Sequence, residues 1–137
     1  MSRLSRVLVI DDEPDMCRAI ALVLKKGGFD VETAADGEQG LALLGSTQFD
    51  AVLIDILMPG VDGLEVLRRI RAQDPLLAVI MLSAVDGMDM KSAAFDAESD
   101  DYVTKPFGVL ELPARVRAIL RRGKPLDDLS INTDLHW

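Results

Sequence analysis

The chain has 137 residues, a length that suits one domain with a short tail. Hydrophobic residues make up 49% of the chain, which is typical of a globular protein, and aromatic residues make up only 4%, so the core must be aliphatic. The net charge of −8 argues against nonspecific binding of this segment to DNA or anionic membranes. The first apolar run of the chain is too short for a signal peptide or a membrane span, so we expect a soluble, cytoplasmic protein.

The chain contains one cysteine, Cys17, and one histidine, His136. A single cysteine cannot form an internal disulfide, and these two residues cannot build a zinc cluster. Cys17 falls within an expected helix, where we interpret it as a residue of no special reactivity. His136 lies in the tail and offers no catalytic geometry.

Short apolar runs alternate with segments of helical periodicity as far as Arg122. The first run, residues 7–10, has no polar residue, which is typical of a parallel strand buried on both faces. Pro14 then suits the first turn of a helix, and Gly27-Gly28 ends that helix. The expected strands are residues 7–10, 29–33, 51–54, 77–82 and 100–104, and the expected helices are residues 14–26, 37–44, 64–73, 88–97 and 109–122.

Five strand–helix units with short connections predict an α/β fold, a five-stranded parallel sheet with helices on both faces. We expect a domain of residues 1–122, followed by a linker in residues 123–137. Within that tail, residues 129–135 alternate apolar and polar side chains as an edge strand would. A strand without a partner suggests the beginning of a second domain.

Polar side chains stand where the expected strands end. Asp11 and Asp12 follow the first strand, Asp55 the third, Ser83 the fourth and Lys105 the fifth. Because the carboxyl ends of parallel strands meet at one edge of a sheet, these side chains should share one cleft. Three carboxylates in one cleft repel one another unless a cation or protons neutralise them. Oxygen ligands without thiolate or imidazole favour Mg²⁺ over zinc at this site.

A Mg²⁺ site beside a carboxylate, a hydroxyl and a lysine provides what phosphoryl transfer needs. Asp55 would be the nucleophile, Lys105 would pair with the phosphoryl group, and Ser83 would donate a hydrogen bond to it. Each residue also has a structural interpretation: Lys105 as a solvated lysine, Ser83 as a strand-end cap, and the acidic pair as charges at a helix N-terminus. All four strand ends being polar together favours the functional interpretation.

Three other classes of protein fit the sequence less well. A dinucleotide-binding or P-loop protein needs a glycine-rich loop after its first strand, where this chain has Asp-Asp-Glu-Pro. Hydrolases with an aspartate nucleophile expect a second Asp two residues later, where this chain has Leu57. A metal-dependent hydrolase would need a general base and a substrate pocket, and the sequence indicates neither.

Four segments together resemble the receiver domain of two-component response regulators. They are the pair Asp11-Asp12, the segment DILMPGVDG that begins at Asp55, MLSA around Ser83, and DDYVTKPF around Lys105. The resemblance implies a (βα)5 flavodoxin-like receiver fold. It also implies that Asp55 accepts a phosphoryl group, in a Mg²⁺-dependent reaction, from a phosphohistidine on a sensor histidine kinase. Such a domain is a signalling module rather than an enzyme in the usual sense.

The resemblance covers about residues 4–122 and implies a set of metal ligands. Asp12 is implied to bind Mg²⁺ directly, and Asp11 to act largely through water. Asp55 and the backbone carbonyl of Leu57 would complete the ligands that the protein supplies.

Ser83 and Tyr102 resemble the switch pair of the family. On phosphorylation the serine would move toward the phosphoryl group and the tyrosine ring would swing inward; alternatively, the ring simply covers the edge strand. The Lys105–Pro106 peptide bond is expected to be cis. One departure stands out: the family usually has Gly-Ala before the DDY segment, where this chain has Glu98-Ser99, so the end of the fourth helix could differ.

Charged residues of both signs lie on the last three expected elements. They resemble the dimer face of the OmpR/PhoB-like, winged-helix subfamily of response regulators, in which phosphorylation drives an isologous dimer. The alternative is an ordinary solvated surface, where exposed ion pairs contribute little. The pairs that the resemblance implies across the two-fold axis are Lys91–Glu111, Asp101–Arg115 and Asp100–Arg122.

The segment after Arg122 resembles the linker and opening strand that lead into a winged-helix DNA-binding domain. The resemblance therefore implies a transcriptional regulator that binds DNA through a domain absent from this chain. The competing interpretation is a stand-alone or kinase-attached receiver, which relays phosphate or binds a protein partner without DNA. The alternating pattern of the tail argues against it.

Overall fold

The computed structural model describes residues 4–84, 88–108 and 110–122. The expected linker and edge strand in residues 123–137 lie outside these ranges, as does the expected first residue of the last helix, Val109. None of the helices in the described ranges is long and apolar enough to cross a membrane.

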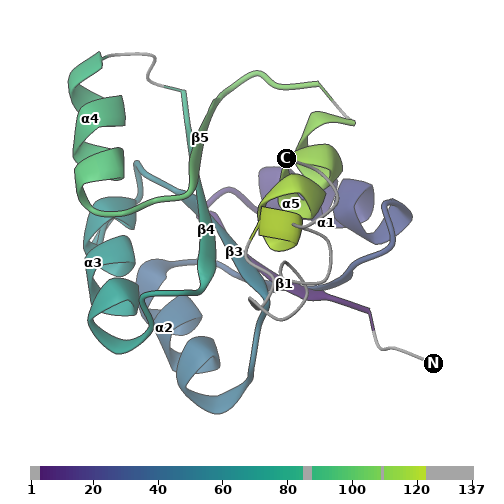
Figure 1. The fold of residues 1–137 in the computed structure, drawn as a ribbon, viewed down its shortest axis with the longest axis horizontal. Helices are drawn as coiled ribbons and strands as arrows, with labels where there is room; N and C mark the ends of the chain where they lie inside the picture. The colour runs from purple at the N-terminus through teal and green to yellow at the C-terminus, as the bar shows by residue number, and fades with distance from the viewer. Residues whose placement is uncertain (1–3, 85–87, 109, 123–137) are drawn as a thin grey trace, which may run out of the picture.

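Five parallel strands form one sheet in the order β2-β1-β3-β4-β5 (Figure 1). The central strand β3 pairs with β1 on one side and β4 on the other. Val9 of β1 lies opposite Leu53 of β3, and Leu53 lies opposite Ile80 of β4. Every residue of β3 and β4 is buried, as expected for strands that are apolar up to their last residue, Asp55 in β3 and Ser83 in β4. The strands are β1 (Arg6–Ile10), β2 (Asp30–Ala34), β3 (Ala51–Asp55), β4 (Ala78–Ser83) and β5 (Asp101–Thr104).

Five helices cover both faces of the sheet. Helices α1 and α5 lie on one side and α2, α3 and α4 on the other, as Figure 1 shows. The buried side chains accordingly form two clusters, one around Leu53 and Val116 and the other around Ile54 and Val66. The helices are α1 (Pro14–Lys26), α2 (Gly37–Ser46), α3 (Gly63–Gln73), α4 (Met88–Asp96) and α5 (Glu111–Arg122).

Local signals in the sequence explain where several helices begin. Pro14 occupies the first turn of α1, where its missing N–H costs nothing. Asp36 accepts a hydrogen bond from the Gln39 N–H at the start of α2. Asp62 accepts one from the Glu65 N–H at the start of α3. Such side-chain caps satisfy backbone donors that the helix itself cannot pair.

The observed elements agree with the sequence-based expectations to within one or two residues at each end. The largest internal difference concerns α2, which continues to Ser46 instead of stopping at Leu44. The Ser46 hydroxyl, in the second of these two additional residues, donates to the Ala42 and Leu43 carbonyls. On α1, Ile20 and Leu24 face the core as expected, and Cys17 and Ala21 join them.

Glycine lets α3 approach the end of β3 closely. A Cβ atom on Gly63 would lie 2.4 Å from the Asp55 carbonyl oxygen and 2.7 Å from the Ile56 Cα. The Gly63 N–H also donates to the Ile56 carbonyl at 2.9 Å. The first residue of α3 is therefore packed against the backbone that carries Asp55.

Candidate functional site

Three carboxylates converge at the carboxyl-terminal edge of the sheet. Asp11 follows β1 and is 1% exposed, Asp55 ends β3 and is 5% exposed, and Asp12 is partly buried. One oxygen from each can be chosen so that all lie within 4.8 Å of one another. This places the three expected acidic residues together, because β1 and β3 are direct neighbours in the sheet.

Lys105 enters the same cluster from the loop after β5. Its Nζ lies 3.2 Å from Asp11 Oδ2 and 3.5 Å from Asp55 Oδ2. Its backbone N–H donates to the Ser83 carbonyl at 2.7 Å, which ties the end of β5 to the end of β4. The Lys105–Pro106 peptide bond is cis, as expected. The side chain is only 12% exposed, so its ammonium has exchanged much of its water for carboxylate oxygens.

Burial controls the protonation of Asp55. Desolvation by burial raises the pKa of its carboxyl from 3.8 to about 6; Lys105 opposes the shift and Asp11 adds to it. Burial acts to lower the pKa of Lys105, but the charges of Asp55 and Asp11 outweigh it and raise that pKa. The ammonium therefore stays charged at neutral pH, while Asp55 is mostly, but not fully, ionised.

Backbone hydrogen bonds hold the acidic residues in place. Asp11 Oδ1 accepts from the Glu13 N–H at 3.0 Å. Asp55 Oδ1 accepts from the Leu57 N–H at 3.3 Å, and the neighbouring Ile56 N–H donates to the Leu82 carbonyl at 2.9 Å. The loop after β3 is thus anchored on both sides of the carboxylate.

The donor set suits a hard divalent cation. Carboxylate oxygens are the ligands that Mg²⁺ prefers, and one lysine does not neutralise three carboxylates. Among the described residues, the ligands that this cluster offers are Asp11, Asp12 and Asp55. That the carbonyl of Leu57 also binds the metal stays a prediction; the Leu57 side chain is 53% exposed beside the site.

Cys17 contacts the site, which the sequence did not reveal. Its Sγ donates to the Asp11 carbonyl at 3.1 Å and lies 3.8 Å from the Ala34 carbonyl. Burial first, and the charge of Asp11 second, raise the pKa of the thiol, which keeps it neutral. The expectation of an unreactive helix residue agrees with this environment. A groove of about 820 Å³ between α1 and β2 opens beside Asp11 and Asp12.

The two expected switch residues lie on adjacent strands. Ser83 ends β4 and is fully buried, and Tyr102 on β5 pairs with Met81 of β4. The tyrosine ring is 7% exposed, and Lys91 Nζ lies 5.8 Å from its centroid. The ring is therefore already buried in this structure, and its expected movement on phosphorylation stays a prediction.

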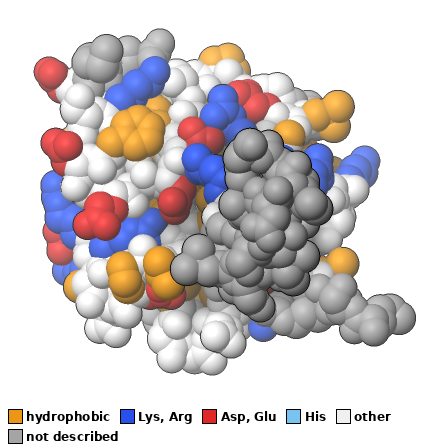
Figure 2. Space-filling model, viewed as in Figure 1, with side chains coloured by type: hydrophobic (Ala, Val, Ile, Leu, Met, Phe, Trp, Pro, Cys, Tyr) orange, Lys and Arg blue, Asp and Glu red, His pale blue; other side chains and the backbone are white. Residues whose placement is uncertain are grey.

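Of the charged residues expected on the dimer face, Asp100, Asp101, Glu111 and Arg115 make ion pairs within their own chain. Arg115 on α5 contacts Asp101 at 2.8 Å and Glu111 at 2.8 Å. The hydrogen bond from Arg115, and a second from the Gly108 N–H, lower the pKa of Glu111. Asp100 contacts Arg71 of α3 at 3.0 Å. Figure 2 shows side chains of both charges interspersed with apolar ones on the side of α3 and α4.

Comparison with known proteins identifies relatives across most of the chain. The family described as "Response regulator receiver domain" matches residues 7–117. The response regulator MprA of Mycobacterium avium is 42% identical over 123 residues, which are 90% of this chain and 54% of MprA. The transcriptional regulatory protein TcrA of Mycobacterium tuberculosis is 43% identical over 118 residues, 86% of this chain and 47% of TcrA. The chain thus spans about half the length of these relatives.

Solved structures share the fold. The receiver domain of the Francisella response regulator 1452 is 37% identical with a TM-score of 0.83, and the match covers 88% of this chain and 99% of that one. The response regulator TrrA from Thermotoga maritima, solved in complex with Mg²⁺-BeF, is 34% identical with a TM-score of 0.78. That match covers 85% of this chain and 99% of TrrA.

Proposed function

The chain belongs to the response regulator receiver domain family, and from this premise we propose that Asp55 accepts a phosphoryl group from a phosphohistidine of a sensor histidine kinase. Receiver domains are signalling domains with a sensor kinase as partner, and they bind Mg²⁺ in an acidic pocket. The observation that carries the proposal is the placement of Asp55. It is nearly buried, in contact with Lys105, and clustered with Asp11 and Asp12.

In the proposed reaction, an Asp55 carboxylate oxygen attacks phosphorus as the phosphorus–nitrogen bond of the donor breaks. The nitrogen keeps the bonding electrons, and the product is an aspartyl phosphate. The reaction needs the ionised carboxylate, which the raised pKa of about 6 leaves in the majority at pH 7. Lys105, already held at the site, would move from Asp11 and Asp55 onto the phosphoryl oxygens, and the Ser83 hydroxyl would donate to another of them.

Asp11, Asp12 and Asp55 would hold Mg²⁺ together with the Leu57 carbonyl. When bound, the metal supplies neutralising charge for the carboxylates and for the incoming phosphoryl oxygens. Support comes from TrrA, a protein of the same fold whose structure was solved with Mg²⁺-BeF. The chain's own part is to orient these oxygens through the Glu13 and Leu57 N–H groups.

We further propose that residues 1–122 form the receiver and that residues 123–137 begin a second, DNA-binding domain. Support comes from the relatives MprA and TcrA, about half of whose length the chain spans, and from the name of TcrA as a transcriptional regulatory protein. The alternative, a receiver that relays phosphate or binds a protein without DNA, predicts that the gene contains no such domain after Trp137.

Intact mass spectrometry tests the phosphoacceptor. The wild type is incubated with acetyl phosphate with and without Mg²⁺, and Asp55→Asn is treated in the same way. We expect a gain of one phosphoryl group, about 80 Da, that requires Mg²⁺ and is absent from the variant. If acetyl phosphate gives no gain, the measurement is repeated with a competent histidine kinase. No gain from the kinase either would reject the proposal.

We also propose that phosphorylation drives a two-fold dimer through α4, β5 and α5, called here the 4-5-5 face. Arg122, exposed at the end of α5, is the residue to test, because Arg115 already binds Asp101 and Glu111 in its own chain. Arg122→Glu should weaken dimerisation of the phosphorylated protein in sedimentation experiments, and Arg121→Glu, a change at its exposed neighbour, should have a smaller effect. Equal dimerisation of wild type and Arg122→Glu would contradict the proposed pair with Asp100.

A further inference from the structure

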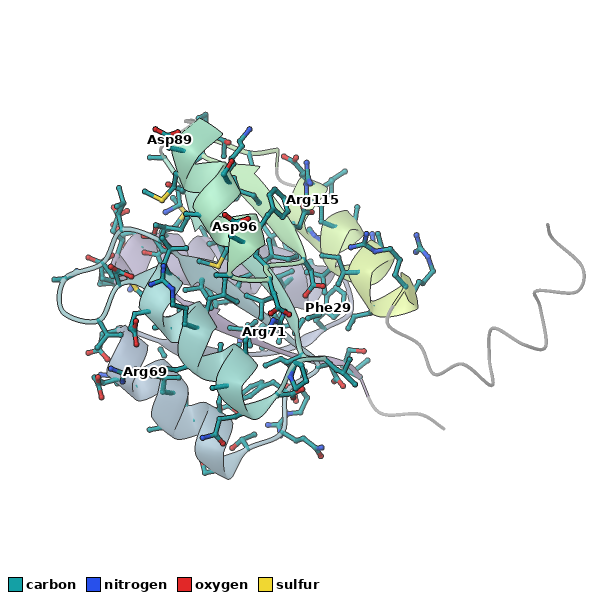
Figure 3. The ribbon with its side chains drawn as sticks, turned by 60° about the vertical axis from the view of Figure 1, so that its left-hand side comes forward. Phe29, Arg69, Arg71, Asp89, Asp96 and Arg115 are labelled. Atoms are coloured by element: carbon teal, nitrogen blue, oxygen red, sulfur yellow. The ribbon has the colours of Figure 1, made fainter. Side chains whose placement is uncertain are left out.

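Arg71, in the last turn of α3, has a side chain that is only 9% exposed. An arginine enclosed to this degree is costly unless its N–H groups find acceptors, because the guanidinium always carries a charge. The hydrogen bonds of Arg71 therefore show which parts of the fold it holds. In Figure 3 it lies in the middle of the molecule, whereas Arg69 of the same helix lies at the edge beside α2.

The guanidinium of Arg71 connects three segments. Its Nη1 donates to the Leu77 carbonyl at 2.6 Å and the Asp74 carbonyl at 3.2 Å, at the junction of α3 and β4. Its Nε donates to the Glu98 carbonyl at 2.9 Å, and its Nη2 to Asp100 Oδ2 at 3.0 Å. The last two acceptors belong to the connection between α4 and β5, called here the α4–β5 corner (residues 97–100). Arg71 thus fixes this corner to α3.

The α4–β5 corner contains a backbone conformation that usually requires glycine. Glu98 has φ +71°, in the left-handed region, where the Cβ of every residue except glycine is crowded by the backbone. The Ser99 N–H reaches back to the Ala94 carbonyl at 3.0 Å, the long hydrogen bond of a Schellman helix end. Glu98 therefore adopts the left-handed conformation in which glycine commonly ends a helix, and α4 ends in this way although the chain has Glu98-Ser99 in place of Gly-Ala. A hydrogen bond from Arg71 to the Glu98 carbonyl holds the strained peptide in this orientation.

Arg71 also orients the carboxylate of Asp100. Asp100 Oδ2 accepts from Arg71 Nη2 and from the Val79 N–H at 2.8 Å. The Asp100 N–H in turn donates to the Val79 carbonyl at 2.8 Å. Among the described residues, both hydrogen bonds that this carboxylate accepts are accepted by Oδ2, and the side chain remains 36% exposed. The other oxygen, Oδ1, is the one left for a partner outside the chain.

We propose that Arg71 is a positioning residue for the 4-5-5 face: it holds the left-handed Glu98 and turns Asp100 so that Oδ1 can receive Arg122 of a second copy. The first half of this proposal concerns the single chain. The second half rests on the proposed phosphorylation-dependent dimer. An arginine on α3, outside the 4-5-5 face, would therefore determine whether one of its ion pairs can form.

Amide hydrogen exchange on the unphosphorylated full chain tests the first half. In Arg71→Gln we expect the Val79, Ser99 and Asp100 amides to exchange about tenfold faster, because Arg71 no longer holds the α4–β5 corner that positions their hydrogen bonds. Val9 and Leu53 in the central strands should keep their exchange rates. Arg69→Gln is the matched control: Arg69 makes exposed ion pairs with Glu65 and Glu38, so its loss should leave these amides unchanged. Unchanged rates in Arg71→Gln, or a uniform rise across the sheet, would overturn the proposal.

A second substitution separates this role from a general loss of stability. Glycine adopts the left-handed conformation without strain, so Glu98→Gly in the Arg71→Gln background should restore slow exchange at Ser99 and Asp100. It should leave Val79 fast, because the Asp100 carboxylate still lacks its guanidinium. Failure of Glu98→Gly to slow Ser99 exchange would show that Arg71 does not act through Glu98.

Dimerisation of the phosphorylated protein tests the second half. Arg71→Gln should be phosphorylated to the same extent as wild type, since Arg71 makes no contact with Asp55, yet dimerise about tenfold more weakly; Arg69→Gln should match wild type. A wild type that is phosphorylated but stays monomeric would reject the proposed dimer, and the exchange data would still decide the role of Arg71 within the chain. Equal dimerisation of wild type and Arg71→Gln would reject the effect on the 4-5-5 face.

Discussion

The two ends of the same parallel sheet place similar charges in different surroundings. At the amino-terminal end, Arg6 is paired with Asp30 at 3.3 Å and Glu32 at 3.0 Å, and its backbone N–H donates to Asp50 Oδ2 at 2.7 Å. Its guanidinium also lies 5.7 Å from the centroid of the Phe49 ring. At the carboxyl-terminal end, Lys105 faces a cluster of three carboxylates. Each end thus combines one cation with several carboxylates, but Asp30 and Glu32 are 54% and 40% exposed to solvent, whereas Asp11 and Asp55 are buried.

The difference shows how a fold can support a site that is unfavourable in isolation. At the amino-terminal end we expect the ion pairs to contribute to stability. At the carboxyl-terminal end, close backbone packing holds Asp55 in place although burial raises its pKa to about 6. We expect an acidic cluster of this kind to be stabilised when it binds a cation, or a phosphoryl group with its metal, because the repulsion between the carboxylates is then relieved. The unfavourable clustering would in this way be useful to function. Four predictions test this contrast, in order of decreasing effect.

Gly63→Ala tests whether packing holds the acidic end. The new Cβ would meet the backbone of Asp55 and Ile56, which cannot move without moving the carboxylate. We expect a loss of about 2–3 kcal/mol in the free energy of unfolding, measured by urea denaturation, and slower phosphorylation. Gly45→Ala in α2, whose Cβ would have no neighbour within 4 Å, is the control and should be neutral or slightly stabilising. Equal stabilities of the two variants would contradict the role given to packing.

Arg6→Gln tests the amino-terminal end. It removes two ion pairs whose carboxylates are 54% and 40% exposed, and we expect a loss of about 1.5 kcal/mol. Arg18→Gln removes an exposed i,i+3 pair with Asp15 and should change stability by less than about 0.5 kcal/mol. Urea denaturation of both variants measures the difference. A loss for Arg6→Gln no greater than for Arg18→Gln would show that the pairing at this end contributes nothing special.

Mg²⁺ should act on the acidic end alone. A ligand at ten times its dissociation constant stabilises the folded state by about 1.4 kcal/mol. Thermal unfolding in increasing MgCl₂ should therefore show a rising midpoint for wild type. Asp12→Asn should lose most of that rise, whereas Arg6→Gln should retain it. NaCl at matched ionic strength separates binding from screening. An identical rise in Asp12→Asn would show that the cluster is not the metal site.

Asp55→Asn should stabilise the metal-free protein. A carboxyl whose folded pKa is raised from 3.8 to about 6 binds more protons when folded, so its penalty is absent below about pH 3.8 and complete above about pH 6. We expect Asp55→Asn to gain on the order of 1 kcal/mol at pH 7 in EDTA, and to lose that gain as pH falls toward 4. Urea denaturation at pH 4, 5, 6 and 7 measures it. A gain that does not depend on pH would point to a cause other than charge.

The sequence by itself determined the strand–helix order and the convergence of Asp11, Asp12, Asp55 and Lys105. The physical reason is geometric: apolar runs of strand length form buried parallel strands, and the carboxyl ends of such strands must meet at one edge. A residue placed by its position at a strand end can therefore be located without knowing the strand order or any side-chain rotamer.

Only the tertiary structure decided which long side chains meet across elements. The apolar periodicity of α3 predicts that Arg71 lies on the outer, solvated face of the helix with other arginines. Its guanidinium instead contacts Asp100, 29 positions away in the sequence. Cys17 likewise reads as a helix residue and touches Asp11. Nothing in the sequence near Glu98 shows that Arg71 holds its carbonyl. Contacts of this kind depend on how α3, β4 and the α4–β5 corner pack, and periodicity carries information about one element at a time.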